Sequence, residues 1–145
     1  MTVPIQISAW NIHGHKSKIV GDKLSDSDFL NEIKDDDIIA LVETHNNDKD
    51  DTLSIPGYQR IKVKNRTNNS GGLAYFAKAG IAKYILPITN LNEDTLWIKI
   101  KKDIVANKQD IFIGTVYLPP YKNNRDNYLK TYLKKLCIFK KKDLS

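Results

Sequence analysis

The sequence of 145 residues contains one cysteine and three histidines. A single cysteine excludes a disulfide framework and a thiolate metal cluster, so Cys137 is interpreted as a small apolar side chain. No apolar run approaches the length of a membrane-spanning helix, and residues 1–4 lack the basic start of a signal peptide. We therefore expect an intracellular protein with no membrane partner, in the nucleus or the cytoplasm.

Internal repeats and linkers rich in proline, glycine or serine are also missing, so residues 1–145 are expected to form a single domain. The apolar content of 41% suits a globular core rather than disorder. The net charge of +6 fits a polyanionic partner, because each lysine or arginine that neutralises a phosphate releases a counterion. The lysines are spread along the chain, so a solvated face explains any single cluster equally well.

Hydrophobic patterns predict the elements of an α/β protein. The segment "SDSDFLNEIK" predicts a helix capped by Ser25 or Ser27. The nearly continuous apolar run Ile38–Val42 is typical of a strand covered on both faces. The other predicted strands are Ile5–Trp10, Tyr58–Val63, Leu73–Lys78, Thr95–Lys101 and Ile111–Tyr117, and the second predicted helix is Asn127–Leu136.

The order of these elements predicts the topology. A crossover helix joins Ile5–Trp10 to Ile38–Val42, so these two strands should be parallel. The later strands are joined by short connections, which indicates antiparallel pairs. We therefore expect an α/β sandwich with mixed, largely antiparallel strands and helices outside packed sheets.

Polar side chains follow three of the predicted strands. Asn11 and Glu43 come after the two parallel strands, whose carboxyl ends emerge at one edge of the sheet. Tyr117 ends another strand and is followed by Pro119 and Pro120, which stop that strand. A lone carboxylate suits Mg²⁺, which keeps most of its waters, while an amide and a phenol can orient phosphate oxygens.

Each of these residues also has an ordinary explanation. Asn11 is a turn former, a strand-end Glu43 is usually solvated, and Tyr117 before two prolines often serves packing. The histidines are not at metal-ligand spacing. The loop "NNSGGLAYF" is either a phosphate-contacting loop, in which glycines let the backbone approach a ligand, or a plain hairpin turn.

The ordered set of motifs resembles a known family. "ISAWNIHGHKSK", "DIIALVETH", "SGGLAYFAK", "LWIKI" and "IFIGTVYLPP" are similar, in order and approximate spacing, to the first half of the endonuclease/exonuclease/phosphatase superfamily. The nearest subgroup is the apurinic-endonuclease-like domain of LINE-type retrotransposons. The resemblance covers nearly the whole chain and implies a DNase I-like α/β sandwich.

The resemblance also implies an activity, which is hydrolysis of phosphodiesters, usually in DNA, with Mg²⁺ or Mn²⁺ as cofactor. Glu43 would hold the metal, and Asn11 and Tyr117 would hold the phosphate and shape the catalytic site. The predicted contacts with DNA or RNA are Ser70, Gly71, Arg66 and Lys16.

The sequence departs from this family in its second half. Complete members continue into an Asp-x-Asn motif, which positions or deprotonates the attacking water, and end in an Asp-His pair whose histidine supports the phosphate. Neither motif occurs here. Each such group contributes roughly 10²-fold or more to the rate. The expected protein is therefore about the first half of the domain, inactive or nearly so alone, with an exposed sheet through which chains can associate.

Two other functions remain open from the sequence. One is a basic nucleic-acid-binding remnant that has lost its chemistry. The other is a phosphoesterase of the same superfamily that acts on a phosphoinositide, a sphingolipid or another phosphoester. The sequence is compatible with a shortened gene, a decayed mobile element and a functional short protein.

Overall fold

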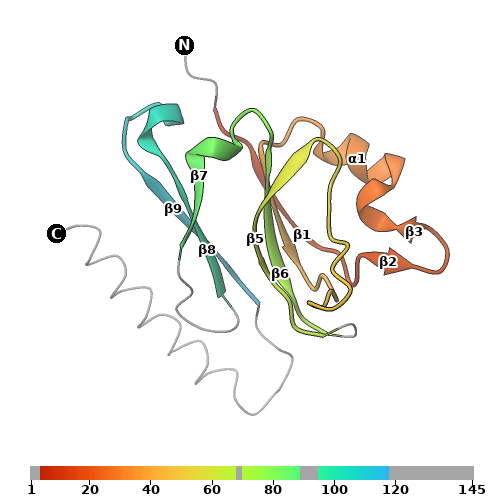
Figure 1. The fold of residues 1–145 in the computed structure, drawn as a ribbon. Coiled ribbons are helices and arrows are strands. Elements are labelled where there is room, and N and C mark those ends of the chain that lie inside the picture. The colour runs from red at the N-terminus through yellow and green to blue at the C-terminus, as the bar shows by residue number, and fades with distance from the viewer. Residues whose placement is uncertain (1–3, 68–69, 89–94, 118–145) are drawn as a thin grey trace.

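The computed structural model describes residues 4–67, 70–88 and 95–117. This part of the chain is a mixed α/β fold in which two sheets pack together, and the helix with the 3₁₀ turn before it covers the outer face of one sheet (Figure 1). The strands are β1 (Ile7–Asn11), β2 (Lys16–Ser17), β3 (Gly21–Asp22), β4 (Ile38–Val42), β5 (Tyr58–Lys64), β6 (Leu73–Lys78), β7 (Ile85–Ile88), β8 (Thr95–Ile100) and β9 (Ile111–Val116). The helical segments are α1 (Ser27–Ile33) and the 3₁₀ turns η1 (Lys23–Ser25), η2 (Ala82–Tyr84) and η3 (Lys102–Ile104).

The central sheet has four strands in the order β1-β4-β6-β5. β1 and β4 are parallel, with Ile7 opposite Ile38 and Asn11 opposite Val42, and the remaining pairs are antiparallel. The predicted parallel pair with its crossover helix is therefore confirmed. Because both strands run the same way, Asn11 and the residue that follows Val42 emerge at the same edge.

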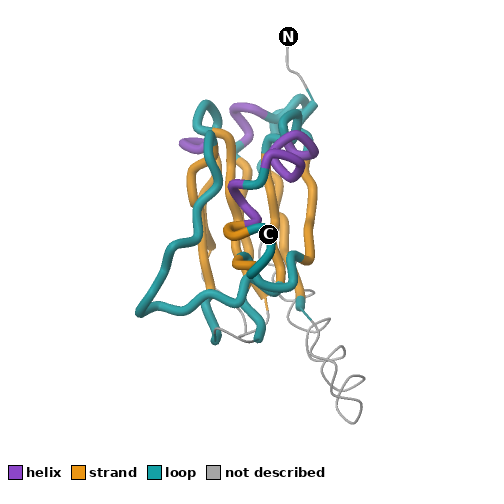
Figure 2. Tube along the Cα trace, turned by 90° about the vertical axis from the view of Figure 1, so that its right-hand side faces the viewer, coloured by secondary structure: helices purple, strands orange, loops and turns teal. Residues whose placement is uncertain are grey.

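A second sheet of three antiparallel strands, in the order β7-β8-β9, covers one face of the central sheet. Figure 2 shows the strands side on, with the loops at their two ends. The sequence patterns did not predict β7. This strand contains Pro87 and lies at the edge of its sheet, where a missing backbone donor is tolerated.

Two apolar cores lie on the two faces of the central sheet. Alternate residues of β4 enter different cores, with Ile38 and Ala40 facing the three-stranded sheet and Ile39 and Leu41 facing α1. All four are at most 3% exposed, so the prediction of a strand covered on both faces is confirmed. Such burial contributes about 25 cal/mol for each Å² of apolar surface removed from water.

The cap of α1 differs from the sequence prediction. Asp26, not Ser25 or Ser27, is the N-cap, and its carboxylate accepts hydrogen bonds from the backbone amides of Asp28 and Phe29, at 3.2 Å each. Serine and aspartate are both good caps, so the pattern predicted the helix but not its first residue. The segment before α1 also forms the short β2–β3 hairpin, which the patterns missed because each strand has only two residues.

The predicted helix Asn127–Leu136 lies outside the described residues, as do Pro119 and Pro120. Large apolar side chains that are exposed in the described part of the chain are scattered over several elements: Ile7, Ile19, Val20, Leu86 and Ile111. Association through an exposed sheet stays a prediction. None of the helices formed by the described residues is long and apolar enough to cross a membrane.

Candidate functional site

The structure brings Asn11, Glu43 and Tyr117 together. The Tyr117 hydroxyl donates a hydrogen bond of 2.6 Å to Glu43 Oε1, although the two residues are 74 positions apart. The Asn11 side chain also interacts with the Glu43 carboxylate. Tyr117 follows β9, so this contact joins the two sheets. The expectation that three strand ends meet is confirmed, but one of them belongs to the second sheet rather than to the sheet of β1 and β4.

Backbone hydrogen bonds hold the segment that follows β4 on both sides. On one side, the Gly14 amide donates to the Glu43 carbonyl at 2.7 Å. On the other, the Thr44 and His45 amides donate to the Gly72 and Gly71 carbonyls at 3.3 and 3.0 Å. The sheet pairing therefore continues past the end of β4, and this places Glu43 on a rigid support.

Glycines make this close approach possible. A Cβ atom built on Gly72 would lie 2.1 Å from Thr44 Oγ1, and one on Gly14 would lie 2.9 Å from His45 Nδ1. Both glycines have positive φ angles, which side chains rarely adopt. The fold itself therefore accounts for Gly72, and the sequence had left open whether these glycines form a plain turn or let the backbone approach a ligand.

Backbone strain gathers at the same place. Among the described residues, four that are not glycine have positive φ, and three of them are His13, Glu43 and His45. Each such conformation costs of order 1–3 kcal/mol, and strain of this kind clusters at functional sites. The three residues lie where backbone hydrogen bonds fix the segments after β1 and β4, and these bonds hold the strained conformations in place.

The Glu43 carboxylate is held in its charged form. The hydrogen bond from Tyr117 is the largest cause that lowers the pKa of Glu43, and the His13 and Asn11 side chains lower it further, against the opposing effect of burial. An ionised carboxylate at neutral pH is the form that binds a cation. Asn11 also acts as a turn former, since its Oδ1 accepts the His13 amide at 3.1 Å. The explanation of Asn11 as a turn former is therefore confirmed, and its role at a phosphate stays a prediction.

The residues present fit a hydrated magnesium-type cation rather than a fully ligated metal. No group of three or more His, Cys, Asp or Glu side chains in residues 4–67, 70–88 and 95–117 is arranged to hold a metal ion. Glu43 supplies the anionic oxygen, and the Oδ1 atom of Asn11 beside it already accepts the His13 amide. Mg²⁺ binds through one or two carboxylates, keeps several waters and takes further oxygens from phosphates, so this donor set suits it.

Two grooves border the rim, and each is lined by one hydrogen-bond partner of Glu43. The first, of about 270 Å³, is lined by Tyr117 and by residues that include Lys64, Arg66 and Gly71. The second, of about 250 Å³, is lined by His13 and by residues that include Lys16 and His45. Of the predicted nucleic-acid contacts, Arg66, Gly71 and Lys16 therefore line grooves beside Glu43.

Ser70, the fourth predicted contact, lies on an exposed turn before Gly71 and does not line either groove. Its carbonyl oxygen accepts hydrogen bonds from the amide and the hydroxyl of Thr67, at 3.3 Å each. Ser70 therefore precedes a lining residue of the first groove, Gly71, in the sequence. Among the described interactions, its side chain makes no contact with Glu43 or Tyr117.

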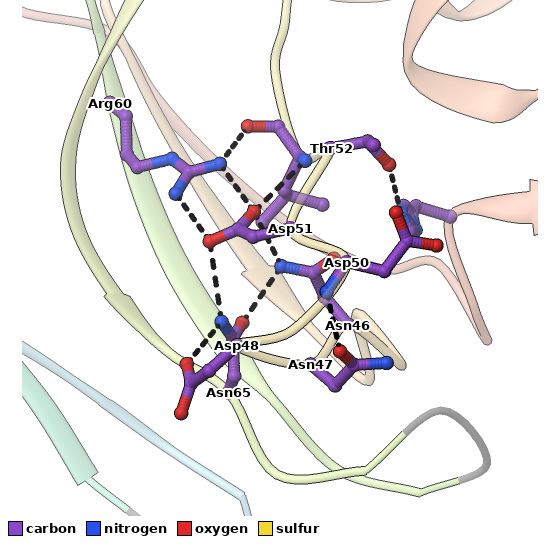
Figure 3. Close-up of polar contacts among 10 residues, drawn as sticks. Asn46, Asn47, Asp48, Asp50, Asp51, Thr52, Arg60 and Asn65 are labelled. Atoms are coloured by element: carbon purple, nitrogen blue, oxygen red, sulfur yellow. Dashed lines mark hydrogen bonds and ion pairs between the residues drawn. The ribbon is translucent and has the colours of Figure 1, made fainter.

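A polar network fastens the loop after Glu43 to β5 (Figure 3). Asp51 receives two hydrogen bonds of 2.7 Å from the Arg60 guanidinium and one of 2.8 Å from Asn46 Nδ2. Asn46 also donates to Asn65 Oδ1 at 2.9 Å. The sequence predicted only a loop for this segment. Its acidic and amide side chains are instead internal partners, and they hold the backbone that carries His45.

His13 is the residue that sequence reasoning missed. Its Nδ1 lies 3.3 Å from Glu43 Oε2, and its ring centroid lies 5.7 Å from that of His45. The histidines were set aside because their spacing matches no metal motif, but the tight turn at Gly14 brings His13 back to the end of β4. The signal in the sequence was the position of His13 two residues after Asn11 and next to Gly14.

Comparison with known proteins assigns no family to the chain. A scan against models of protein families and a search of curated proteins both found no match. The function proposed below therefore rests on the geometry of the rim and on the motifs quoted above.

Proposed function

We propose that the rim around Glu43 is the metal- and phosphate-binding edge of a phosphodiester hydrolase of the endonuclease/exonuclease/phosphatase type, with a DNase I-like sandwich as its fold and a retrotransposon endonuclease as its relative. The observation that carries the proposal is the hydrogen bond of 2.6 Å from Tyr117 to Glu43, which joins residues from two sheets. Three of the five motifs that suggested the family carry the residues that meet there.

The side chains have separate roles in this proposal. Glu43 holds Mg²⁺ or Mn²⁺, and the Asn11 amide donates to a phosphate oxygen. The single proton of the Tyr117 hydroxyl is donated to Glu43 in this structure, and it would turn to a phosphate oxygen once a cation occupies the Glu43 carboxylate. Lys16 and Arg66, in the two grooves, contact phosphates on either side. When bound, the divalent cation supplies positive charge that stabilises charge developing on the phosphate.

Little turnover is expected from these 145 residues alone. The sequence contains neither an Asp-x-Asn motif nor an Asp-His pair to take a proton from water and to support the phosphate. A missing general base lowers the rate by roughly 10²- to 10⁴-fold. The proposed function of this chain by itself is therefore to bind a divalent cation and a nucleic acid, with slow hydrolysis.

Replacing Glu43 with glutamine tests the cation site. We expect Mn²⁺ and Mg²⁺ to bind at least about tenfold more weakly to Glu43→Gln, because the amide lacks the negative charge that a hard cation requires. Isothermal titration calorimetry measures both affinities. Glu32→Gln, which removes an exposed carboxylate on α1, is the matched control and should bind as the wild type does. Equal affinities for wild type and Glu43→Gln would remove the basis of the proposal.

Replacing His13 with alanine tests its part in the same site. Imidazole nitrogen suits Mn²⁺ better than Mg²⁺, so His13→Ala should weaken Mn²⁺ binding by about threefold or more and Mg²⁺ binding less. The ratio of the two affinities within one variant is the internal control. A ratio that does not change would show that His13 lies beside the cation site without taking part in it.

A plasmid-nicking assay tests the expected slow hydrolysis. With Mg²⁺ present, wild type and Glu43→Ala should both nick supercoiled DNA close to the background rate. Robust nicking by wild type that Glu43→Ala loses would contradict the low turnover and indicate a competent hydrolase. DNA binding that falls steeply with salt but needs neither Glu43 nor a cation would instead favour the basic binding module.

A further inference from the structure

The tip of the β2–β3 hairpin exposes apolar side chains that do not help to form the turn. Ile19 is 95% exposed and Val20 is 51% exposed. Gly21, with φ +80°, supplies the left-handed residue, and Ser17 Oγ accepts the amides of Ile19 and Val20 at 3.1 and 3.3 Å. Turns favour Gly, Asn, Asp, Ser and Pro, so neither local stability nor burial explains the choice of Ile and Val at this tip.

The hairpin is tied firmly to the rim that carries Glu43. Lys23 Nζ donates to the carbonyl oxygens of Ile12 and His13, at 2.9 and 3.2 Å, and the Lys23 amide donates to the His15 carbonyl at 2.7 Å. Lys16, at the start of the hairpin, lines the groove beside His13. The apolar tip therefore has a fixed position relative to the proposed phosphate site.

The charges around the tip favour a polyanion. Lys16 and Lys18 lie just before it in the chain. Lys16 Nζ lies 3.7 Å from Asp50 Oδ2 in an exposed ion pair, and among the described residues no hydrogen bond or ion pair engages the Lys18 side chain. The one carboxylate of the hairpin, Asp22, is occupied by the Leu24 amide and the Ser25 hydroxyl. A ligand for this tip must present anions beside an apolar interior that one aliphatic side chain can enter. Duplex DNA, with phosphates outside and stacked bases inside, has this construction.

A bilayer surface is the other anionic partner with an apolar interior, and the distribution of exposed apolar side chains argues against it. Ile7 begins β1 and Ile111 begins β9, at the opposite ends of the strands from Asn11 and Tyr117. One flat surface would therefore meet only the hairpin tip. A narrow groove of a nucleic acid needs no more than that tip.

We propose that Ile19 is a wedge that enters between adjacent base pairs of duplex DNA bound along the Glu43 rim, while Lys16 and Lys18 contact the flanking phosphates. This inference rests on the proposed nucleic-acid function. Proteins that bind the minor groove insert aliphatic side chains in this way, which partly unstacks a base step and bends the duplex. The hairpin then selects DNA that is easily unstacked, before any chemistry at the phosphate.

The test uses the full chain and a short duplex that carries 2-aminopurine, a base whose fluorescence rises when it unstacks. Wild type should raise the fluorescence on binding. Ile19→Ala should lose most of that rise and bind about fivefold more weakly, as the loss of one partly buried aliphatic side chain implies. Ile19→Leu should retain both properties. Leu86→Ala, which removes another exposed apolar side chain at a distance from the rim, is the matched control and should behave as wild type does.

Lys18→Ala tests the contribution of the Lys18 charge separately from the insertion of Ile19. It should weaken binding and reduce the slope of log affinity against log salt by about one, because one phosphate contact is lost, yet keep the fluorescence rise of the bound complex. An unchanged rise in Ile19→Ala with salt-dependent DNA binding intact would overturn the wedge and leave the proposed function standing. Binding to anionic vesicles that depends on Ile19, without a fluorescence change in DNA, would also overturn it. Absence of any DNA binding would overturn the wedge and the nucleic-acid function together.

Discussion

Gly72→Ala is expected to lower the free energy of unfolding by about 3–4 kcal/mol, the sum of left-handed backbone strain and overpacking. Gly72 has φ +99°, and its added Cβ atom would lie 2.1 Å from the Oγ1 atom of the fully buried Thr44. Thr44 directly follows Glu43, so relief of the clash must also move the candidate site. Urea denaturation measures the stability, and titration with Mn²⁺ on the remaining folded protein measures the site.

Gly57→Ala is the matched control for this substitution. Gly57 has a similar φ of +82°, but nothing lies within 4 Å of its added Cβ atom. It should therefore cost only the backbone strain, about 1–2 kcal/mol, and leave cation binding unchanged. Equal losses in the two variants would mean that the segment carrying Glu43 is not packed against Gly72 as described.

Asp51→Asn is expected to cost about 2 kcal/mol at neutral pH, because Arg60 loses a charged partner that it contacts through two nitrogens. The Asp51 and Arg60 side chains are 24% and 36% exposed, so the loss should be smaller than for a fully buried ion pair. The substitution also loosens the loop that carries His45. Urea denaturation at pH 7 measures the cost, and Asp35→Asn, at an exposed carboxylate after α1, is the control.

The same pair predicts a pH dependence. The hydrogen bonds from Arg60 are the main reason that the pKa of Asp51 lies well below its usual range. A lowered pKa in the folded state means that the stabilisation is complete above the unfolded pKa of about 3.9 and is lost as the pH falls below it. The stability difference between wild type and Asp51→Asn should therefore shrink progressively below about pH 4. A difference that stays constant from pH 7 to pH 3 would contradict this role of Asp51.

Much of the central sheet was predictable because the apolar pattern within each segment indicates whether that segment forms a strand. The runs Ile38–Val42 and Leu73–Lys78 have the bounds of β4 and β6, since both strands are buried and almost uninterrupted. Strands that begin or end in polar residues were predicted to within about one or two residues. β7 was missed because of Pro87, and the β2–β3 hairpin was missed because two-residue strands leave no periodic pattern.

The candidate site was predictable only in part. The crossover helix requires Asn11 and Glu43 to emerge at one edge, so their proximity follows from chain order. His13 could not be found in this way, because its contact with Glu43 arises from a left-handed turn beside Gly14. The roles of Asn46, Asp51 and Arg60 could not be found either, because their contacts join the loop after Glu43 to β5 and the residue that follows it.

The sequence by itself determined six of the nine described strands, the parallel pairing of β1 and β4, and the polar residues at the ends of that pair. Those properties depend on alternation, on apolar runs and on the length of connections, all of which are local. Only the tertiary structure decided that Tyr117 contacts Glu43 from the second sheet and that Gly72 makes room for Thr44. It also decided that the Ile19 side chain is almost fully exposed at the hairpin tip. The physical reason is that these facts depend on how two sheets pack and where loops close, and no short stretch of sequence encodes a distance between such segments.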